Sequence, residues 1–292
     1  MNRANRVRFR FGCGFFLLLI LLTPTVRSAT LEIGQKARSI QPGEVLLLTV
    51  ESDEALTGVS ASGFDRTFPF FPVTEHKWEG LVGIDLDVRP GSYDIAVDAK
   101  SLSGVLEKVH RIKVLPKKFP VRELKVEPKY VEPPASEMKR IQEESRLIKQ
   151  IFSGVRPERL WEGPFLRPVP GEANSSFGKR SVYNGKPRSP HTGTDFRGAE
   201  GTPVKAPGAG EVLLVRNLYF AGNTVIIDHG QGLFSYFAHL SKFDVKEGDR
   251  VARGDVVGRV GATGRVTGPH LHWTLRLVET RVSPLSLLEV TQ

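Results

Sequence analysis

From Gly171 to the Pro284-Leu-Ser-Leu-Leu288 tail, the sequence consists of short apolar segments separated by glycine-rich turns, and this pattern limits the fold more than any other feature. It shows no convincing helical periodicity before the tail. Loops such as 228–232 and 246–249 carry the residues that favour tight turns. We therefore expect an antiparallel sheet with one wetter face, built from strands near 210–215, 224–228, 233–239, 256–260 and 271–277.

Histidines are concentrated in this strand-rich region, because five of the seven in the chain lie between residues 191 and 272. In a strand that begins near Gly268, His270 and His272 would project from one face, while Leu271 and Trp273 would point to the other. One face of that strand would pack and the other would be free for chemistry. Most of these histidines lie in three short segments: His191-Thr-Gly-Thr-Asp195, Tyr236-Phe-Ala-His239-Leu-Ser241 and Gly268-Pro-His270-Leu-His272-Trp273.

The spacing of these side chains suits a metal site. His191 and Asp195 are separated by Thr-Gly-Thr, which favours a loop running into a strand over a helix, and such a loop can direct both side chains toward one centre. Two imidazoles and one carboxylate around an open fourth position make a catalytic zinc site, with Zn–N distances of about 2.0–2.1 Å. Each segment alone is a weak signal, and the three together favour metal binding.

These segments resemble the zinc-dependent cell-wall endopeptidases of the lysostaphin and β-lytic type, the peptidase M23 family with its LytM-like domain. The resemblance covers about residues 175–284. It rests on motifs that follow one another in the family's order: Ser175-Ser-Phe-Gly178, Pro190-His-Thr-Gly-Thr-Asp195, Gly201-Thr-Pro-Val204, Gly222-Asn-Thr-Val-Ile-Ile-Asp-His-Gly230, Ala238-His-Leu-Ser241, Gly248-Asp249 and Gly261-Ala-Thr-Gly-Arg-Val-Thr-Gly-Pro-His-Leu-His-Trp273.

The resemblance implies a role for each of five residues. His191, Asp195 and His272 match the family's metal ligands, so that one Zn²⁺ per chain is expected, and His239 and His270 match its two catalytic histidines that do not bind the metal. Relatives that have lost ligands serve only as regulators of other wall hydrolases. Because all five positions are filled here, the resemblance implies an active zinc metalloendopeptidase that hydrolyses peptide cross-links or stem peptides of bacterial peptidoglycan.

Two other functions are weighed against the enzyme. The same scaffold can serve as a non-catalytic protein that binds wall material or activates a partner hydrolase. The segments 205–212 and 245–251 are similar to the hairpins of biotinyl and lipoyl carrier domains, but no lysine stands at a suitable hairpin tip. Within the peptidase region, His229 is interpreted as a loop residue, and Arg265 and Thr267 are candidates for substrate contact.

Residues 29–115 show period-2 alternation between turn residues, which predicts a small β-sandwich-like domain with strands near 45–50, 78–82, 92–97 and 105–114. His76 and His110 lack clustered partner ligands, so we assign this domain to positioning or binding. Residues 116–170 hold nine of the 20 prolines and predict an extended linker with one helix at 136–152, capped by Ser136. This helix either packs across the two domains or lies near the active groove and restrains it.

The N-terminus is typical of an export signal. Arginines within residues 1–10 precede an apolar run at 11–22 and small residues near Ala29, which predicts a signal peptide at 1–28. The apolar run is shorter than the roughly 20 residues of a spanning helix, so an uncleaved anchor is the weaker alternative. Cleavage would remove Cys13, the only cysteine, and lower the formal charge from +9 to +4. A charge of +4 does not indicate a nucleic-acid-binding protein. We expect a periplasmic protein in preference to a fully extracellular one.

The expected fold is therefore mainly β. An N-terminal β-sandwich-like domain at 29–115 and a proline-rich linker with one helix at 116–170 precede an antiparallel, barrel-sandwich-like peptidase domain at 171–292. The expected partners are peptidoglycan peptides as substrate, without nucleic acid and without stable membrane insertion after signal cleavage. A protein regulator is left open.

Overall fold

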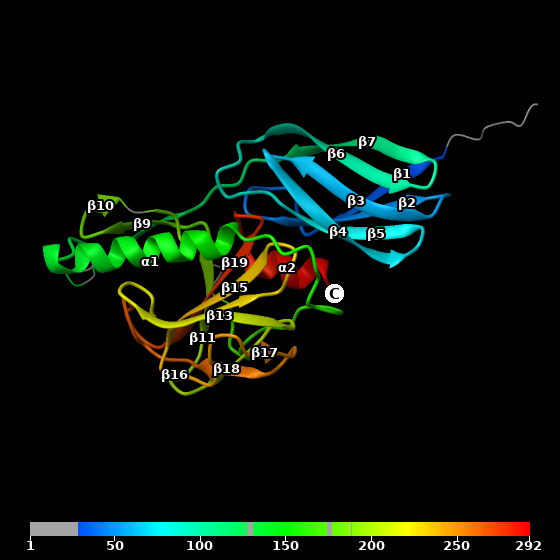
Figure 1. The fold of residues 1–292 in the computed structure, drawn as a ribbon. Helices are drawn as coiled ribbons and strands as arrows, with labels where there is room; N and C mark the ends of the chain where they lie inside the picture. The colour runs from blue at the N-terminus through cyan, green and yellow to red at the C-terminus, as the bar shows by residue number, and fades with distance from the viewer. Residues whose placement is uncertain (1–28, 126, 128–130, 174–176, 188) are drawn as a thin grey trace, which may run out of the picture.

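The structure of the chain is a computed structural model that describes residues 29–125, 127, 131–173, 177–187 and 189–292 (Figure 1). The signal peptide predicted at 1–28 lies outside these residues, as do residues 174–176 at the start of the Ser175-Ser-Phe-Gly178 motif. The mainly β fold is confirmed: the described residues form two large antiparallel sheets, smaller sheets and two helices. Neither of these helices combines the length and apolarity needed to cross a membrane.

The first large sheet is formed by the N-terminal part of the chain. Buried side chains alternate along its strands, as in Leu46, Leu48 and Val50, and fill the interior of the sheet. His110 at one edge bonds Gln35 at the other (Nε2 to Oε1, 2.8 Å), so the sheet nearly closes on itself. Its strand order is β1-β2-β5-β4-β3-β6-β7, with bounds β1 (Leu31–Ala37), β2 (Val45–Ser52), β3 (Leu56–Gly63), β4 (Arg66–Thr74), β5 (Lys77–Gly83), β6 (Gly91–Ser101) and β7 (Gly104–Val114).

The second large sheet is formed by the C-terminal part. Its core contains the rings of Phe237 and Trp273, which stack with centroids 6.2 Å apart. A small sheet with the order β12-β18-β16 accompanies it. The large sheet has the order β11-β19-β15-β14-β13-β17, with β20 paired to β19; the bounds are β11 (Gly193–Arg197), β12 (Pro203–Lys205), β13 (Gly210–Leu218), β14 (Gly222–Asp228), β15 (Leu233–Leu240), β16 (Lys242–Phe243), β17 (Arg250–Val251), β18 (Val256–Arg259), β19 (His270–Leu277) and β20 (Thr280–Val282).

The connecting segment contributes β8 (Val121–Leu124), which pairs in parallel with β9 (Arg180–Tyr183); β10 (Lys186–Pro187) completes this small sheet. The long helix α1 (Ala135–Ser153) runs beside the second sheet (Figure 1), where Phe152 packs on Phe234 with centroids 5.7 Å apart. The helix itself is confirmed, but its predicted cap is wrong. Pro134 occupies the extended N-cap position, so Ser136 lies inside the first turn and the helix has no side-chain cap.

The two parts of the molecule are docked through the C-terminal end of the chain. The helix α2 (Pro284–Val290) lies between the two sheets (Figure 1), and Ser286 Oγ accepts a hydrogen bond from the backbone N–H of Val45 at 2.9 Å. Beside it, the Arg281 guanidinium pairs with the carboxylates of Asp85 and Asp87. These contacts hold the first sheet against the second, while the domain limits at 115 and 170 stay a proposal.

Candidate metal centre

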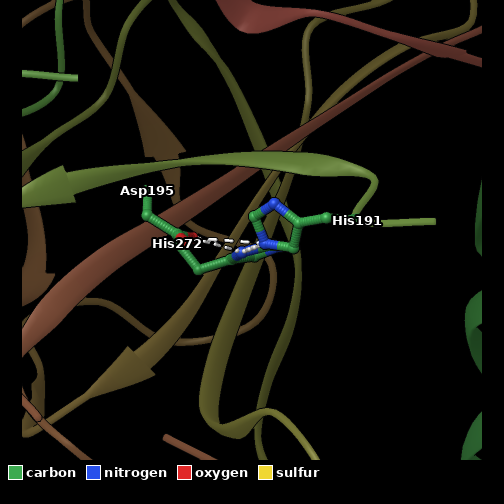
Figure 2. Close-up of side chains that lie close together, drawn as sticks. All are labelled: His191, Asp195 and His272. Atoms are coloured by element: carbon green, nitrogen blue, oxygen red, sulfur yellow. Dashed lines mark hydrogen bonds and ion pairs between the residues drawn. The ribbon is translucent and has the colours of Figure 1, made fainter. Parts of the chain in front are cut away.

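The three residues expected to bind metal come together at β11 and β19 (Figure 2). The antiparallel pairing of these strands places Asp195 directly opposite His272, and His191 lies in the loop that leads into β11. The Nε2 atom of His191 is 2.9 Å from Nδ1 of His272 and 3.3 Å from Oδ1 of Asp195. That carboxylate oxygen is in turn 3.0 Å from Nδ1 of His272. Three potential ligand atoms therefore face one point.

Neighbouring residues position the two histidines. The N–H of His191 donates to the carbonyl of Lys179 (2.9 Å), and its carbonyl accepts from the N–H of Gly178 (2.7 Å). The Nε2 of His272 lies 2.9 Å from the Thr274 hydroxyl, which leaves Nδ1 to face the cluster. Gly193 makes room for this ring, since a Cβ there would lie 2.5 Å from Cε1 of His272. Any side chain at position 193 would displace the imidazole.

The electrostatics of the cluster favour the protonation states that bind metals. Burial alone would raise the pKa of Asp195, but hydrogen bonds with His191 and His272 outweigh it and hold the pKa well below its usual range. Burial also lowers the pKa of His272. An anionic carboxylate beside a neutral imidazole is the state in which both groups coordinate a cation.

His239 is turned toward this cluster by an irregularity in β15. In regular alternation Ala238 and His239 would face opposite sides of the sheet, and Ala238 pairs with His272. The register between β14 and β15 shifts here, and His239 has a positive φ of 65°, an uncommon conformation for a residue other than glycine. The bulge brings the His239 ring to within 5.8 Å of the His272 ring, centroid to centroid.

The rings of His239 and His270 are both held in a fixed orientation by a backbone carbonyl. Nδ1 of His239 donates to the carbonyl of Thr263 (2.9 Å), and Nδ1 of His270 donates to the carbonyl of Gly268 (2.8 Å). Each Nε2 is therefore the acceptor nitrogen of a neutral ring, and Nε2 of His270 lies 3.8 Å from Oδ1 of Asp195. Burial, followed by the nearby histidines, lowers the pKa of His239 to about 3, so this ring is neutral at physiological pH. The two ring centroids are 5.0 Å apart.

All five predicted residues line one groove, whose cavity volume is about 470 Å³. Arg265 and Thr267, the candidates for substrate contact, line it as well, and the Arg265 guanidinium lies between the rings of Tyr183 (4.9 Å) and Phe220 (4.8 Å). The sequence did not identify several other lining residues. They come from α1, from the β9 segment and from the far end of β19: Ile148, Phe152, Lys179 and Arg276.

His229 lies away from the groove and is fully buried. Its Nδ1 donates to the carbonyl of Ala209 (2.8 Å), and its Nε2 accepts from the hydroxyl of Ser235 (2.8 Å). Ser235 also accepts a hydrogen bond from the indole N–H of Trp273 at 3.1 Å. The interpretation of His229 as a loop residue therefore needs one addition, because its ring supports the strand that carries His272.

A carboxylate and two imidazoles that face one point, with two further histidines beside them in a groove, are typical of metal-dependent hydrolases. Comparison with known proteins supports the same class. The profile of Peptidase family M23 matches residues 189–284. The crystal structure of a Pseudomonas aeruginosa protein assigned to peptidase M23 superposes with a TM-score of 0.68 and 33% identity, covering 87% of this chain and 97% of that chain. The chain belongs to peptidase family M23.

Curated relatives share part of the chain. Peptidoglycan DD-endopeptidase ShyA of Vibrio cholerae serotype O1 is 48% identical over 103 residues, which are 35% of this chain and 24% of that protein. DD-carboxypeptidase/endopeptidase Mpg of Neisseria meningitidis serogroup B is 43% identical over 97 residues, which are 33% of this chain and 22% of that protein. The chain thus matches less than a quarter of the length of each of these two relatives.

Proposed function

We propose that the chain is a zinc metalloendopeptidase that hydrolyses peptide cross-links or stem peptides of bacterial peptidoglycan. The observation that carries this proposal is the convergence of His191 Nε2, Asp195 Oδ1 and His272 Nδ1 on one point in the wall of a groove. Membership of peptidase family M23 supports a peptide hydrolase, and the names of ShyA and Mpg support peptidoglycan as the substrate class.

The three converging atoms fit a zinc ion. They lie 2.9 to 3.3 Å from one another, close to the separation of about 3.3 Å expected between ligands that surround a tetrahedral zinc at 2.0–2.1 Å. In the state that binds a metal, two imidazole nitrogens and a carboxylate oxygen all direct lone pairs inward, and they cannot then hydrogen-bond to one another. One cation satisfies all three at once. His191, Asp195 and His272 would hold it, one ion per chain.

When bound, zinc supplies a Lewis acid that polarises the scissile carbonyl and acidifies water. The protein supplies the proton transfers. His239, neutral and held by Thr263 through Nδ1, presents a free Nε2, and His270 is held in the same way by Gly268. Together these imidazoles can take the proton of the attacking water and deliver one to the leaving amine. The groove orients the peptide past both rings.

We also propose that the protein is exported and works in the periplasm, on the basis of the arginine-rich start and apolar run within residues 1–28. Cell fractionation with an epitope fused to the C-terminus would test this proposal. Recovery of the full-length chain in the cytoplasm would contradict it. A regulating protein partner would be sought by cross-linking in the same fraction.

The direct test of the proposed function combines metal content with hydrolysis of isolated peptidoglycan, with and without a chelator. We expect about one zinc per chain, release of new peptide amines, and loss of that release on chelation. His239→Ala is the matched control, because it should keep the zinc and lose the hydrolysis. Zinc without release from any peptidoglycan would favour the non-catalytic alternative, a scaffold that binds wall material or activates another hydrolase.

A further inference from the structure

The groove face of β19 carries one more functional side chain beyond the metal centre. Alternate residues of a strand share a face, so the face that presents His270 and His272 continues through Thr274 to Arg276. All four line the groove cavity. With a rise of about 3.3 Å per residue, the backbone of Arg276 lies about 13 Å along the strand from that of His272. Arg276 therefore stands at a defined distance from the cluster.

The guanidinium of Arg276 lies beneath the C-terminal end of α1. Its central carbon is 5.4 Å from the centre of the Phe152 ring. Its Nη1 is completely buried, and no residue that the structure describes accepts a hydrogen bond from this atom. Arginine normally places five N–H donors in a planar fork. At Arg276 a buried part of that fork has no acceptor in the described chain.

The carboxylate that acts on Arg276 is already paired elsewhere. Asp85 raises the pKa of Arg276, but it accepts hydrogen bonds from the backbone N–H (2.8 Å) and Nε (3.1 Å) of Arg281. Burial dominates and lowers the pKa of Arg276 to about 10, which still leaves the side chain charged at neutral pH. A partly buried cation with an unpaired donor is costly, and an anionic ligand in the groove would offset that cost.

We propose that Arg276 is a specificity-determining residue that binds a carboxylate group of the peptide substrate. This inference rests on the proposed function, which identifies the ligand as a peptide. The geometry of the groove indicates that the group bound by Arg276 is a carboxylate. A planar guanidinium matches a carboxylate through two parallel hydrogen bonds, which gives orientation as well as affinity. Because an extended peptide advances about 3.3–3.6 Å per residue, the carboxylate would lie about four residues from the cleaved bond.

The test uses two synthetic cross-link peptides that differ only in a free carboxylate or a carboxamide about four residues from the cleaved bond, prepared on either side of that bond. For the zinc-loaded wild-type chain we expect kcat/KM at least tenfold higher for the carboxylate peptide on one side. In Arg276→Gln this ratio should fall to about one, while Arg276→Lys should retain part of it. Zinc content and the circular dichroism spectrum verify that each variant is folded.

Arg265→Gln is the matched control, since it removes another arginine of the same groove and should leave the carboxylate preference in place. Loss of the preference in Arg265→Gln with retention in Arg276→Gln would overturn the assignment. So would a wild-type enzyme that cleaves both peptides equally on both sides. If Arg276 has a purely structural role beneath Phe152, Arg276→Gln should lower kcat/KM by the same factor for both peptides of a pair. That result would also overturn the assignment.

Failure of the proposed function gives a different result, because the wild-type chain would then cleave neither peptide. In that case the same peptides are titrated calorimetrically into the zinc-loaded chain. If the wild-type chain binds the carboxylate peptide more tightly and Arg276→Gln removes this difference, the carboxylate site would be supported even though the chain is not an enzyme for these peptides. Equal binding of the two peptides would overturn it.

Discussion

The buried ring of His229 should make the stability of this protein sensitive to mild acid. The ring has no solvent exposure and already uses both nitrogens, one as a donor to Ala209 and one as an acceptor from Ser235. Burial lowers its pKa to about 4 from an ordinary value of 6.5. Protonation would place a second N–H against the Ser235 hydroxyl and a charge where water does not reach.

The sign and size of the effect follow from the two pKa values. Between pH 6.5 and pH 4 the unfolded state binds a proton at His229 and the folded state does not, so stability falls as the pH falls. At 1.36 kcal/mol per pKa unit, lowering the pH from 7.5 to 4.5 costs about 2 to 3 kcal/mol of unfolding free energy through this residue. This loss is a sizeable part of the 5–15 kcal/mol that is typical of folded proteins.

The assay is urea denaturation of the wild-type chain and of His229→Gln at several pH values. The glutamine keeps a polar side chain at the site but cannot titrate, and every other ionisable group is common to the two proteins. The stability of the wild type relative to the variant should therefore decrease by about 2 to 3 kcal/mol from pH 7.5 to pH 4.5. A difference that stays constant over this range would refute the reasoning.

Four further changes test the metal centre and the docking of the two sheets. Asp195→Ala should lower both zinc content and hydrolysis, and full zinc occupancy would remove this residue from the ligand set. His239→Ala should abolish turnover with zinc retained, as measured by metal analysis beside an amine-release assay. Gly193→Ala brings a methyl group to 2.5 Å from the His272 ring and should weaken zinc binding about tenfold or more in competition with a chelating dye. Arg281→Ala removes the ion pairs to the first sheet and should lower the unfolding free energy by about 2 kcal/mol; unchanged denaturation would show that this contact is dispensable.

The strands that the sequence predicted are those in which apolar residues alternate with polar ones or form a continuous run between turn residues. β19 is an example of alternation, and this pattern alone placed His270 and His272 on the face opposite Leu271 and Trp273, which are both buried. β3 and β4 were missed because their local pattern argues against a strand. Small residues fill Leu56–Gly63, and two prolines interrupt Arg66–Thr74, so these strands depend on the neighbours with which they pair.

The residues that line the groove also differ in whether a local sequence pattern or the tertiary structure places them there. A strict alternation in β15 would have turned His239 away from the groove, and only the resemblance to a known family suggested a catalytic role. The bulge that reverses its direction is a property of the pairing between β14 and β15. The wall supplied by α1 likewise depends on docking, since an apolar stripe on a helix does not specify which surface it covers.

The position of Arg276 follows from a local pattern, whereas its lack of a partner follows from tertiary contacts. For this reason the sequence alone did not identify it as a specificity residue. Period-2 alternation from His272 places it on the groove face, so its position could have been predicted. Its lack of an acceptor could not, because that depends on Asp85, a residue 191 positions earlier that is already engaged by Arg281. Docking brings Asp85 near both arginines, and Arg281 takes its hydrogen bonds. Because Asp85 still raises the pKa of Arg276, the N-terminal part would influence substrate choice without entering the groove, by helping to keep Arg276 charged.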